Sequence, residues 1–258
     1  MPQSITDSPG TPRSGGTPVA ETARCTPAIS IVIPVYRSES YLATTVETLL
    51  RFFGSSASVE VILVNDASPD GVQRVIDALT TRDARVRGLR LDRNVGQHAA
   101  LLRGFAVARG ATVVTLDDDG QNPPDAAAAV ASALERDALD LCYGRPRRVA
   151  QRPLRRVASR LNGWMFRVSS GARVTPTNVR ALRGELARAL AAREVPSPYL
   201  DAMLHGAARR VGAVDVDHHP RAEGRSTYTP ARLVRLWFAH VFAFAAARAS
   251  ATPWEAGR

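Results

Sequence analysis

The chain has 258 residues, of which 45% are apolar, and this is enough to bury one sizeable core. All 34 basic residues are arginines, which excludes a Schiff-base lysine and the lysine of a Walker-type phosphate loop. The formal charge of +10 favours an anionic partner, whether nucleic acid, a membrane surface or a phosphorylated substrate. We attribute the arginine richness to genome composition and predict one catalytic domain.

Residues 1–27 are crowded with Pro, Gly, Ser and Thr and lack the apolar core of a signal peptide, so we predict a disordered tail. Cys25 and Cys142 lack the spacing of a zinc site or a disulfide framework, which fits a reducing, cytoplasmic setting. No run of 18 apolar residues is present, so no transmembrane helix is expected. The apolar stretch 233–251 predicts a helix that packs on the domain or lies on a bilayer.

From residue 29 onwards, short apolar runs alternate with longer stretches of helical periodicity. We predict strands at 29–34, 59–64, 86–91, 111–116 and 139–144. The intervening helices are predicted at 39–53, 71–80, 96–110 and 125–136. This alternation is typical of an α/β fold with a mostly parallel central sheet flanked by helices.

The regular alternation of predicted strands and helices ends after Arg145. Helices are predicted at 153–170, 181–192 and 199–208, an irregular VTPTN segment follows the first of them, and a strand is predicted at 211–218. We therefore expect a nucleotide-binding half at 28–145 and a smaller half at 146–229 that completes the acceptor side. Residues 230–258 would form a C-terminal helix and tail.

Ligands of open parallel sheets bind beyond the carboxyl ends of the strands, so polar residues that directly follow apolar runs are the first site candidates. Four predicted strands are followed by such residues. They are Pro34-Val35-Tyr36 with Glu39, Asn65-Asp66, Arg93-Asn94 with Gly96, and Asp117-Asp118-Asp119.

The acidic triplet predicts a divalent-metal site, because adjacent carboxylates repel one another unless solvent or a cation lies between them. Mg²⁺ or Mn²⁺ accepts one or two carboxylates together with substrate phosphates. Side chains alternate along an extended segment, so we expect Asp117 and Asp119 to point to the same side and to bind the metal. The competing interpretation is a solvated acidic turn.

These segments together resemble glycosyltransferase family 2 of the GT-A fold. The resemblance is carried by ISIVIPVYRSESYL, VEVILVNDASPDGV, LDRNVGQHAALLRGFAVARG and VVTLDDDGQNPPD. Within that family the chain is most similar to the polyprenyl-phosphate sugar transferases, the group of dolichol-phosphate mannosyltransferase. Tyr143-Gly144-Arg145 and the run from Arg221 to Tyr228 resemble two later motifs of that group, so that the resemblance covers about residues 28 to 230.

The resemblance implies transfer from a UDP-, GDP- or dTDP-sugar, with inversion, to a polyprenyl phosphate or another acceptor. Asp119 would hold the metal against the diphosphate, and Asp201 would be a base or would orient the acceptor. The donor would be bound by Pro34, Tyr36, Glu39, Asp66, Gly96, Asp117, Asp118 and Gln121. The acceptor would be bound by Arg145, Arg221, Arg225, Ser226 and Tyr228.

Other interpretations remain open at this stage. Gly120 stands where the group usually has Leu, and two transmembrane helices that often follow are absent, so a transferase acting on a hydroxyl of a soluble saccharide or secondary metabolite is the alternative. A nucleotidyltransferase would need a Gly-rich loop after Ile33, which the sequence lacks. A nucleic-acid-binding protein is disfavoured because only 6% of the residues are aromatic. We expect a cytoplasmic enzyme with peripheral contact to the inner face of the membrane, and the oligomeric state is not indicated.

Overall fold

A computed structural model describes residues 26–54, 58–147, 174–193 and 200–217. Several sequence predictions therefore lie outside the described residues. These are almost all of the tail at 1–27, the helix at 153–170, the C-terminal segment at 230–258, and the acceptor candidates Arg221, Arg225, Ser226 and Tyr228.

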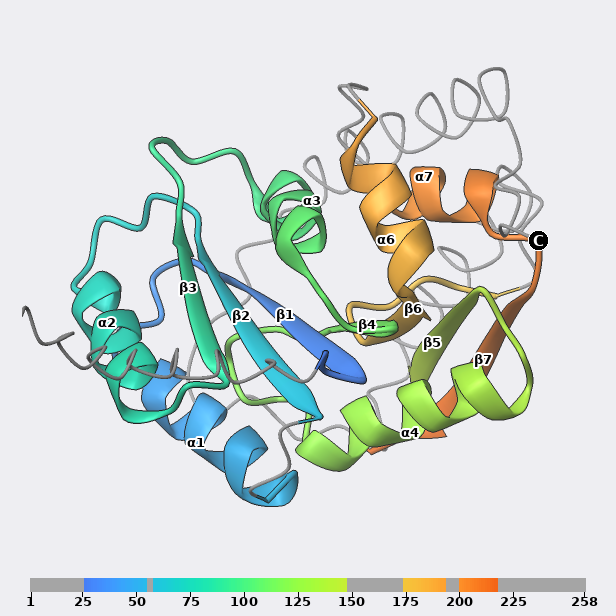
Figure 1. The fold of residues 1–258 in the computed structure, drawn as a ribbon, viewed down its shortest axis with the longest axis horizontal. Coiled ribbons are helices and arrows are strands. Elements are labelled where there is room, and N and C mark those ends of the chain that lie inside the picture. The colour runs from blue at the N-terminus through green and yellow to red at the C-terminus, as the bar shows by residue number, and fades with distance from the viewer. Residues whose placement is uncertain (1–25, 55–57, 148–173, 194–199, 218–258) are drawn as a thin grey trace, which may run out of the picture.

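The described chain is built around one seven-stranded sheet in the order β3-β2-β1-β4-β6-β5-β7 (Figure 1). The strands are β1 (Ile29–Val35), β2 (Val59–Asn65), β3 (Val86–Arg90), β4 (Thr112–Thr115), β5 (Leu141–Pro146), β6 (Arg180–Arg183) and β7 (Val211–Val216). Strands β1 to β4 are mutually parallel, β5 and β7 are parallel to each other, and β6 lies antiparallel between β4 and β5. The carboxyl ends of the six other strands therefore meet at one edge of the sheet, and β6 begins there.

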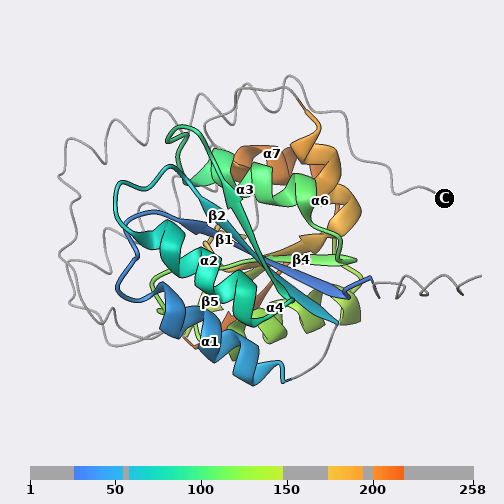
Figure 2. The ribbon, with the colours of Figure 1, turned by 60° about the vertical axis from the view of Figure 1, so that its left-hand side comes forward.

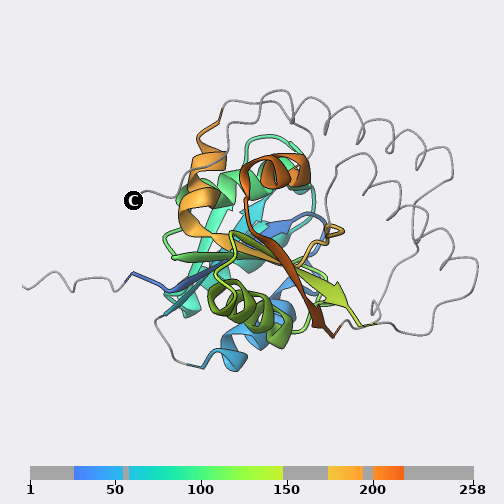
Figure 3. The same cartoon turned by 90° about the vertical axis from the view of Figure 1, so that its right-hand side faces the viewer.

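Helices cover both faces of the sheet (Figures 1 and 2). One face packs against α1 (Leu42–Phe52), α2 (Val72–Arg82) and α4 (Pro124–Arg136). The other face packs against α3 (Gln97–Val107), α6 (Gly184–Ala191) and α7 (Leu200–Ala207). Figure 3 shows the same layers from the side of β7. Strands that are buried on both faces read as apolar runs, and residues 31–35 of β1 and 61–64 of β2 do so because this three-layer packing leaves neither face in water.

The predicted parallel half agrees with the structure, whereas β6 was missed. The sequence predicted one helix over 181–192, but Arg180–Arg183 forms a strand and the helix starts only at Gly184. The segment RALR has no β-branched residue, so nothing local marks it as a strand. Its pairing with β4 and β5 makes it one.

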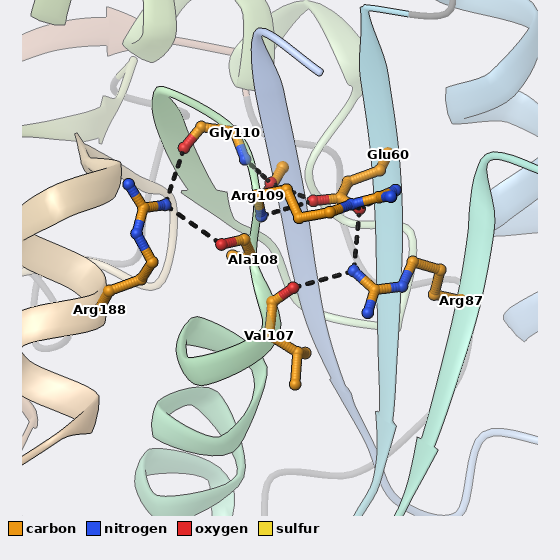
Figure 4. Close-up of polar contacts among 8 residues, drawn as sticks. Glu60, Arg87, Val107, Ala108, Arg109, Gly110 and Arg188 are labelled. Atoms are coloured by element: carbon orange, nitrogen blue, oxygen red, sulfur yellow. Dashed lines mark hydrogen bonds and ion pairs between the residues drawn. The ribbon is translucent and has the colours of Figure 1, made fainter. Parts of the chain in front are cut away.

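At the amino-terminal ends of the parallel strands, a buried carboxylate holds neighbouring segments together. The side chain of Glu60, on β2, is 2% exposed and forms ion pairs with Arg109 at 2.8 Å and with Arg87 at 3.1 Å (Figure 4). Ser30 donates a hydrogen bond to the same carboxylate at 2.6 Å. Burial alone would raise the pKa of Glu60, but these hydrogen bonds together lower it below its ordinary value. The cluster fixes the segment before β4 and lies at the end of the strands away from their carboxyl ends.

Within the described part of the chain, none of the helices is long and apolar enough to span a bilayer.

Candidate active site at the carboxyl edge of the sheet

A cavity of about 540 Å³ lies at the carboxyl edge of the sheet. Its walls come from the ends of β1 and β2, the loop between β3 and α3, the acidic triplet after β4 and the segment before β6. The lining residues are Pro34, Val35, Tyr36, Asp66, Asn94, Gly96, Gln97, Asp117, Asp118, Asp119, Gln121 and Asn178. Seven of the eight residues predicted to bind the donor are among them.

Asp117 is held from two sides by amide groups. Gln97, at the start of α3, donates to Oδ1 at 2.8 Å, and Asn178, before β6, donates to Oδ2 at 2.9 Å. Burial is the main cause that raises the pKa of Asp117, and the charge of Asp119 adds to it. The amide groups orient a carboxylate that would otherwise be costly to keep ionised there.

Asp118 faces the loop that follows β1. Its Oδ2 accepts the backbone N–H of Tyr36 at 3.2 Å. Burial, together with repulsion from Asp117 and Asp119, nevertheless raises the pKa of Asp118 to about 6. Strand β4 ends at Thr115, so strand alternation does not extend through the triplet, and all three carboxyl groups line the cavity.

Asp119 lies in a tight turn that Gly120 permits. Its Oδ1 accepts the backbone N–H of Gln121 at 3.1 Å, and Gly120 has a φ of 68°, in the left-handed region. A side chain on Gly120 would also approach Thr45 Oγ1 to 3.3 Å. The glycine that departs from the family pattern is therefore matched to this backbone geometry.

Asp66 holds the loop between β3 and α3 against the cavity. Its two carboxylate oxygens accept the backbone N–H groups of Val95 at 2.7 Å and Gly96 at 2.8 Å. Asn94 closes the arrangement by donating to the carbonyl of Asp66 at 3.2 Å. Gly96 has a φ of 85°, which permits the sharp entry into α3.

Glu39 is the predicted donor-binding residue that does not line the cavity. Its carboxylate accepts the backbone N–H of Gly71 at 2.8 Å and pairs with Arg74 at 3.4 Å. Asp70 completes the link by accepting the backbone N–H of Glu39 at 3.1 Å. Glu39 thus joins the loops after β1 and β2 and does not line the pocket.

Asp201, the candidate base, lies in the first turn of α7 and forms an ion pair with Arg180. Tyr143 donates a hydrogen bond to the same oxygen, Oδ1, at 3.1 Å. The Asp201 side chain is 14% exposed and does not line the cavity. The helix itself is attached to α3, because His98 Nδ1 accepts the backbone N–H of Leu200 at 3.1 Å.

Arg145, predicted to bind the acceptor, lies at the exposed end of β5. It pairs with Asp215 of β7 at 2.6 Å, and both residues line a separate cavity of about 380 Å³ with Pro146 and Arg147. This side chain is 68% exposed, so it remains accessible to an anion that displaces the carboxylate.

Three residues of these networks escaped the sequence reasoning. Gln97 and Asn178 orient Asp117, and Arg180 pairs with Asp201. The search considered residues that follow strands and so included Asn94, which braces the loop, but it could not find Asn178 because that residue precedes a strand. Gln97 could have been found as the first helical residue after Gly96.

The residues of the cavity fit a divalent cation that shares its ligands with a substrate. Among the residues that the structure describes, no three His, Cys, Asp or Glu side chains form a ready-made metal cage. Burial is the largest cause of the raised pKa values of Asp117 and Asp118, and repulsion between the neighbouring aspartates adds to it, so the hydrogen-bond donors around them do not fully offset the cost of their charged forms. Carboxylates in this state suit a hard cation that keeps open positions for phosphate oxygens.

Comparison with known proteins supplies independent findings. The family model described as glycosyl transferase family 2 matches residues 30–188. An undecaprenyl-phosphate 4-deoxy-4-formamido-L-arabinose transferase of Shewanella sediminis is 34% identical over 218 residues, covering 81% of this chain and 64% of that protein. The enzyme of the same name from Aeromonas hydrophila is 31% identical, covering 81% of this chain and 65% of that protein. The chain thus spans less than two thirds of the length of these relatives.

Solved structures share the fold. A mannosyltransferase from Pyrobaculum calidifontis, in complex with GDP-Man and Mn²⁺, superposes with a TM-score of 0.58 at 15% identity, covering 87% of this chain and 74% of that one. Glucosyl-3-phosphoglycerate synthase from Mycobacterium tuberculosis, with Mn²⁺, UDP-glucose and phosphoglyceric acid, gives 0.58 at 18% identity, covering 92% and 86%. These likenesses identify the fold as GT-A, as the sequence resemblance predicted.

Proposed function

The chain belongs to glycosyltransferase family 2, and on that premise we propose that it transfers a sugar from a nucleotide-sugar to a polyprenyl phosphate. The observation that carries this proposal is the acidic cavity at the carboxyl edge of the sheet. The three carboxyl groups of the acidic triplet lie there together with Asp66 and the start of α3, whose backbone N–H groups suit a diphosphate.

For the donor, we assign the cavity to the nucleotide-sugar. Tyr36 is 41% exposed and would offer a ring face to the base, and Gly96, which also lines the cavity, precedes the first residue of helix α3. Asp119, with Asp117 beside it, would hold Mg²⁺ or Mn²⁺ against the diphosphate. The metal would neutralise charge that develops on the departing nucleoside diphosphate. The solved relatives that bind GDP-Man or UDP-glucose together with Mn²⁺ support this class of donor.

For the acceptor, the state of Asp201 favours a group that is already ionised. Its Oδ1 accepts hydrogen bonds from both Arg180 and Tyr143, and Asp201 does not line the cavity. A hydroxyl acceptor needs a base to remove its proton, whereas a phosphate oxygen does not. The names of the curated relatives point to undecaprenyl phosphate as an acceptor of this class.

The reaction we propose is a single displacement. An oxygen of the acceptor phosphate forms a bond to the anomeric carbon while the bond from that carbon to the diphosphate breaks. The nucleoside diphosphate leaves with the bonding electrons, and the configuration at the anomeric carbon is inverted. In this reaction Gln97 and Asn178 keep Asp117 oriented, and Asp66 keeps the loop that carries Gly96 closed on the donor.

The test is transfer of radiolabel from UDP-glucose, UDP-N-acetylglucosamine or GDP-mannose to undecaprenyl phosphate in the presence of Mn²⁺. We expect a lipid-extractable product with at least one donor, and no product when EDTA replaces the metal. Transfer to the hydroxyl of a soluble saccharide, with none to the lipid phosphate, would instead support the second candidate. Gly120 favours that candidate, because it stands where the polyprenyl-phosphate sugar transferases usually have Leu.

We also propose that the enzyme works in the cytoplasm at the inner face of the membrane, because that is where a lipid-phosphate acceptor meets a soluble nucleotide-sugar. The sequence prediction of a bilayer-facing helix at 230–258 falls outside the described residues. Vesicles with and without undecaprenyl phosphate test the location. Equal co-sedimentation of the full chain and of a chain ending at residue 229 would argue against membrane contact by that segment.

A further inference from the structure

Arg180 is a buried cation in the middle of the sheet. It lies on β6, opposite Thr115 of β4 and Tyr143 of β5, and only 1% of the residue is exposed. A guanidinium in such a place is costly unless its charge is compensated. Compensation comes from Asp201 on α7, and Tyr143 adds a hydrogen bond to the same carboxylate oxygen.

The guanidinium is also constrained by its other neighbours. Its central carbon lies 5.9 Å from the centre of the Tyr143 ring. Its Nε has no hydrogen-bond partner in the part of the chain that the structure describes. A protein that needed only a filled core would be served by an apolar side chain here, since replacing a buried ion pair by apolar residues is often neutral or stabilising.

The segment at the start of β6 contacts one aspartate of the donor cavity and one aspartate of the proposed acceptor side. Asn178, two residues before Arg180, donates to Asp117 at 2.9 Å, and Asp117 lines the donor cavity. Arg180 itself binds Asp201 on the helix of the acceptor half. One short segment thus fixes a carboxylate of the donor side and a carboxylate of the acceptor side relative to each other.

We propose that Arg180 is a positioning residue, which holds Asp201 and helix α7 at the distance from the donor cavity that acceptor attack requires. This inference rests on the proposed sugar transfer. It assigns no direct contact between Arg180 and the substrates. It predicts that loss of Arg180 impairs use of the acceptor while binding of the nucleotide-sugar is retained, because the donor cavity keeps its own residues.

The experiment compares Arg180→Met, Arg180→Lys, Asp201→Asn and the double variant Arg180→Met/Asp201→Asn. The single Arg180→Met change leaves Asp201 without its counter-ion and is expected to lower Tm, whereas the double variant removes both charges and regains Tm. Measured quantities are Tm, the Kd of the nucleotide-sugar by calorimetry with Mn²⁺, and kcat and KM for undecaprenyl phosphate. Donor hydrolysis by water is measured in parallel because it needs no acceptor.

We expect the double variant to fold, to bind the donor within about twofold of wild type, and to lose at least tenfold in kcat/KM for the acceptor. Arg180→Lys should recover part of that loss. Arg183→Met is the matched control, since Arg183 lies on the same strand at the opposite edge and pairs with Asp140 at 3.3 Å. It should lower Tm without changing KM for the acceptor.

The outcomes separate the two proposals. If the wild-type chain neither transfers sugar nor hydrolyses the donor, the proposed function is overturned, and this inference with it. If the wild type transfers sugar and the double variant does so equally well, the pair is only structural, and the positioning role alone is overturned.

Discussion

At the scale of single residues, the three adjacent aspartates have different surroundings. Asp117 accepts hydrogen bonds from two side-chain amides, and Asp118 accepts one from a backbone N–H of the loop after β1. Asp119 accepts a hydrogen bond from the backbone N–H of Gln121 in a turn. The first two carry raised pKa values, with burial as the largest cause. Similar residues in one short run can therefore have distinct roles, which their order in the sequence does not reveal.

Asp119→Ala should reduce metal-dependent release of nucleoside diphosphate by at least about a hundredfold, because a ligand that holds the metal against the diphosphate would be lost. Release is measured with saturating nucleotide-sugar over a range of Mn²⁺ concentrations. Asp137→Ala is the control, since Asp137 pairs with Arg136 on the exposed end of α4. Full activity of the Asp119 variant would contradict the assignment.

At the scale of elements, different kinds of residues lie at the two ends of the parallel strands. Acidic and amide side chains surround a cavity at the carboxyl ends, whereas the buried Glu60 cluster lies at the amino-terminal ends (Figure 4). Helix α3 connects the two, because it begins at the cavity with Gln97 and is followed by Arg109, which binds Glu60. The candidate site and the buried ion-pair cluster thus lie at opposite ends of the same strands.

The Glu60 cluster should make stability depend on acid. The pKa of Glu60 is lower in the folded chain than its ordinary value of 4.5, so its contribution is fully present above that value and is lost as pH falls through the folded pKa. Glu60→Gln is expected to cost about 3 kcal/mol at pH 7. The difference in free energy of unfolding between this variant and wild type should narrow as pH falls below 4.5, the ordinary pKa of the glutamate.

Thermal unfolding of both chains from pH 7 down to pH 3 measures this effect. Glu47→Gln is the control, because Glu47 forms an exposed pair with Arg82 at 3.7 Å and should change Tm little at any pH. A constant difference in Tm between the Glu60 variant and wild type across the acid range would show that the charge of Glu60 does not cause the loss of stability.

Helix α3 packs closely on the sheet at Gly104. A Cβ at this position would lie 2.3 Å from Val32 Cγ1 and 3.1 Å from Val64 Cγ2, both on buried strands. Gly104→Ala should therefore destabilise the fold by about 1–3 kcal/mol, although alanine favours helices. Chemical denaturation measures it, with Ala106→Ser on the exposed side of α3 as the control. A more stable Gly104 variant would mean that the sheet can move aside.

At the scale of the whole molecule, binding of donor and metal should stabilise the chain. A ligand at about a hundred times its Kd contributes about 2.7 kcal/mol, which corresponds to a rise in Tm of about 5–10 °C for a chain of this size. We expect this rise with a matching nucleotide-sugar and Mn²⁺ together, and a smaller one with the sugar and EDTA. Differential scanning fluorimetry across several nucleotide-sugars would identify the base, and an equal rise in EDTA would argue against a metal.

The sequence by itself determined the parallel half of the fold and most of the donor cavity. Strands β1, β2 and β4 carry apolar runs that mark them locally, and the rule that ligands bind beyond the carboxyl ends of strands found Asp66, Gly96 and the acidic triplet. The family resemblance was confirmed by the match over residues 30–188. The roles given to single site residues remain predictions.

Only the tertiary structure decided how the two halves are joined. Strand β6 has no local strand signal and exists because β4 and β5 offer it backbone partners on both sides. That pairing brings Asn178 to Asp117, 61 residues apart, and Arg180 to Asp201. The parallel pairing of β1 with β2 likewise brings Glu39 to the loop after β2 instead of the cavity. Contacts between residues so far apart depend on strand order and register, which no periodicity within a single segment encodes.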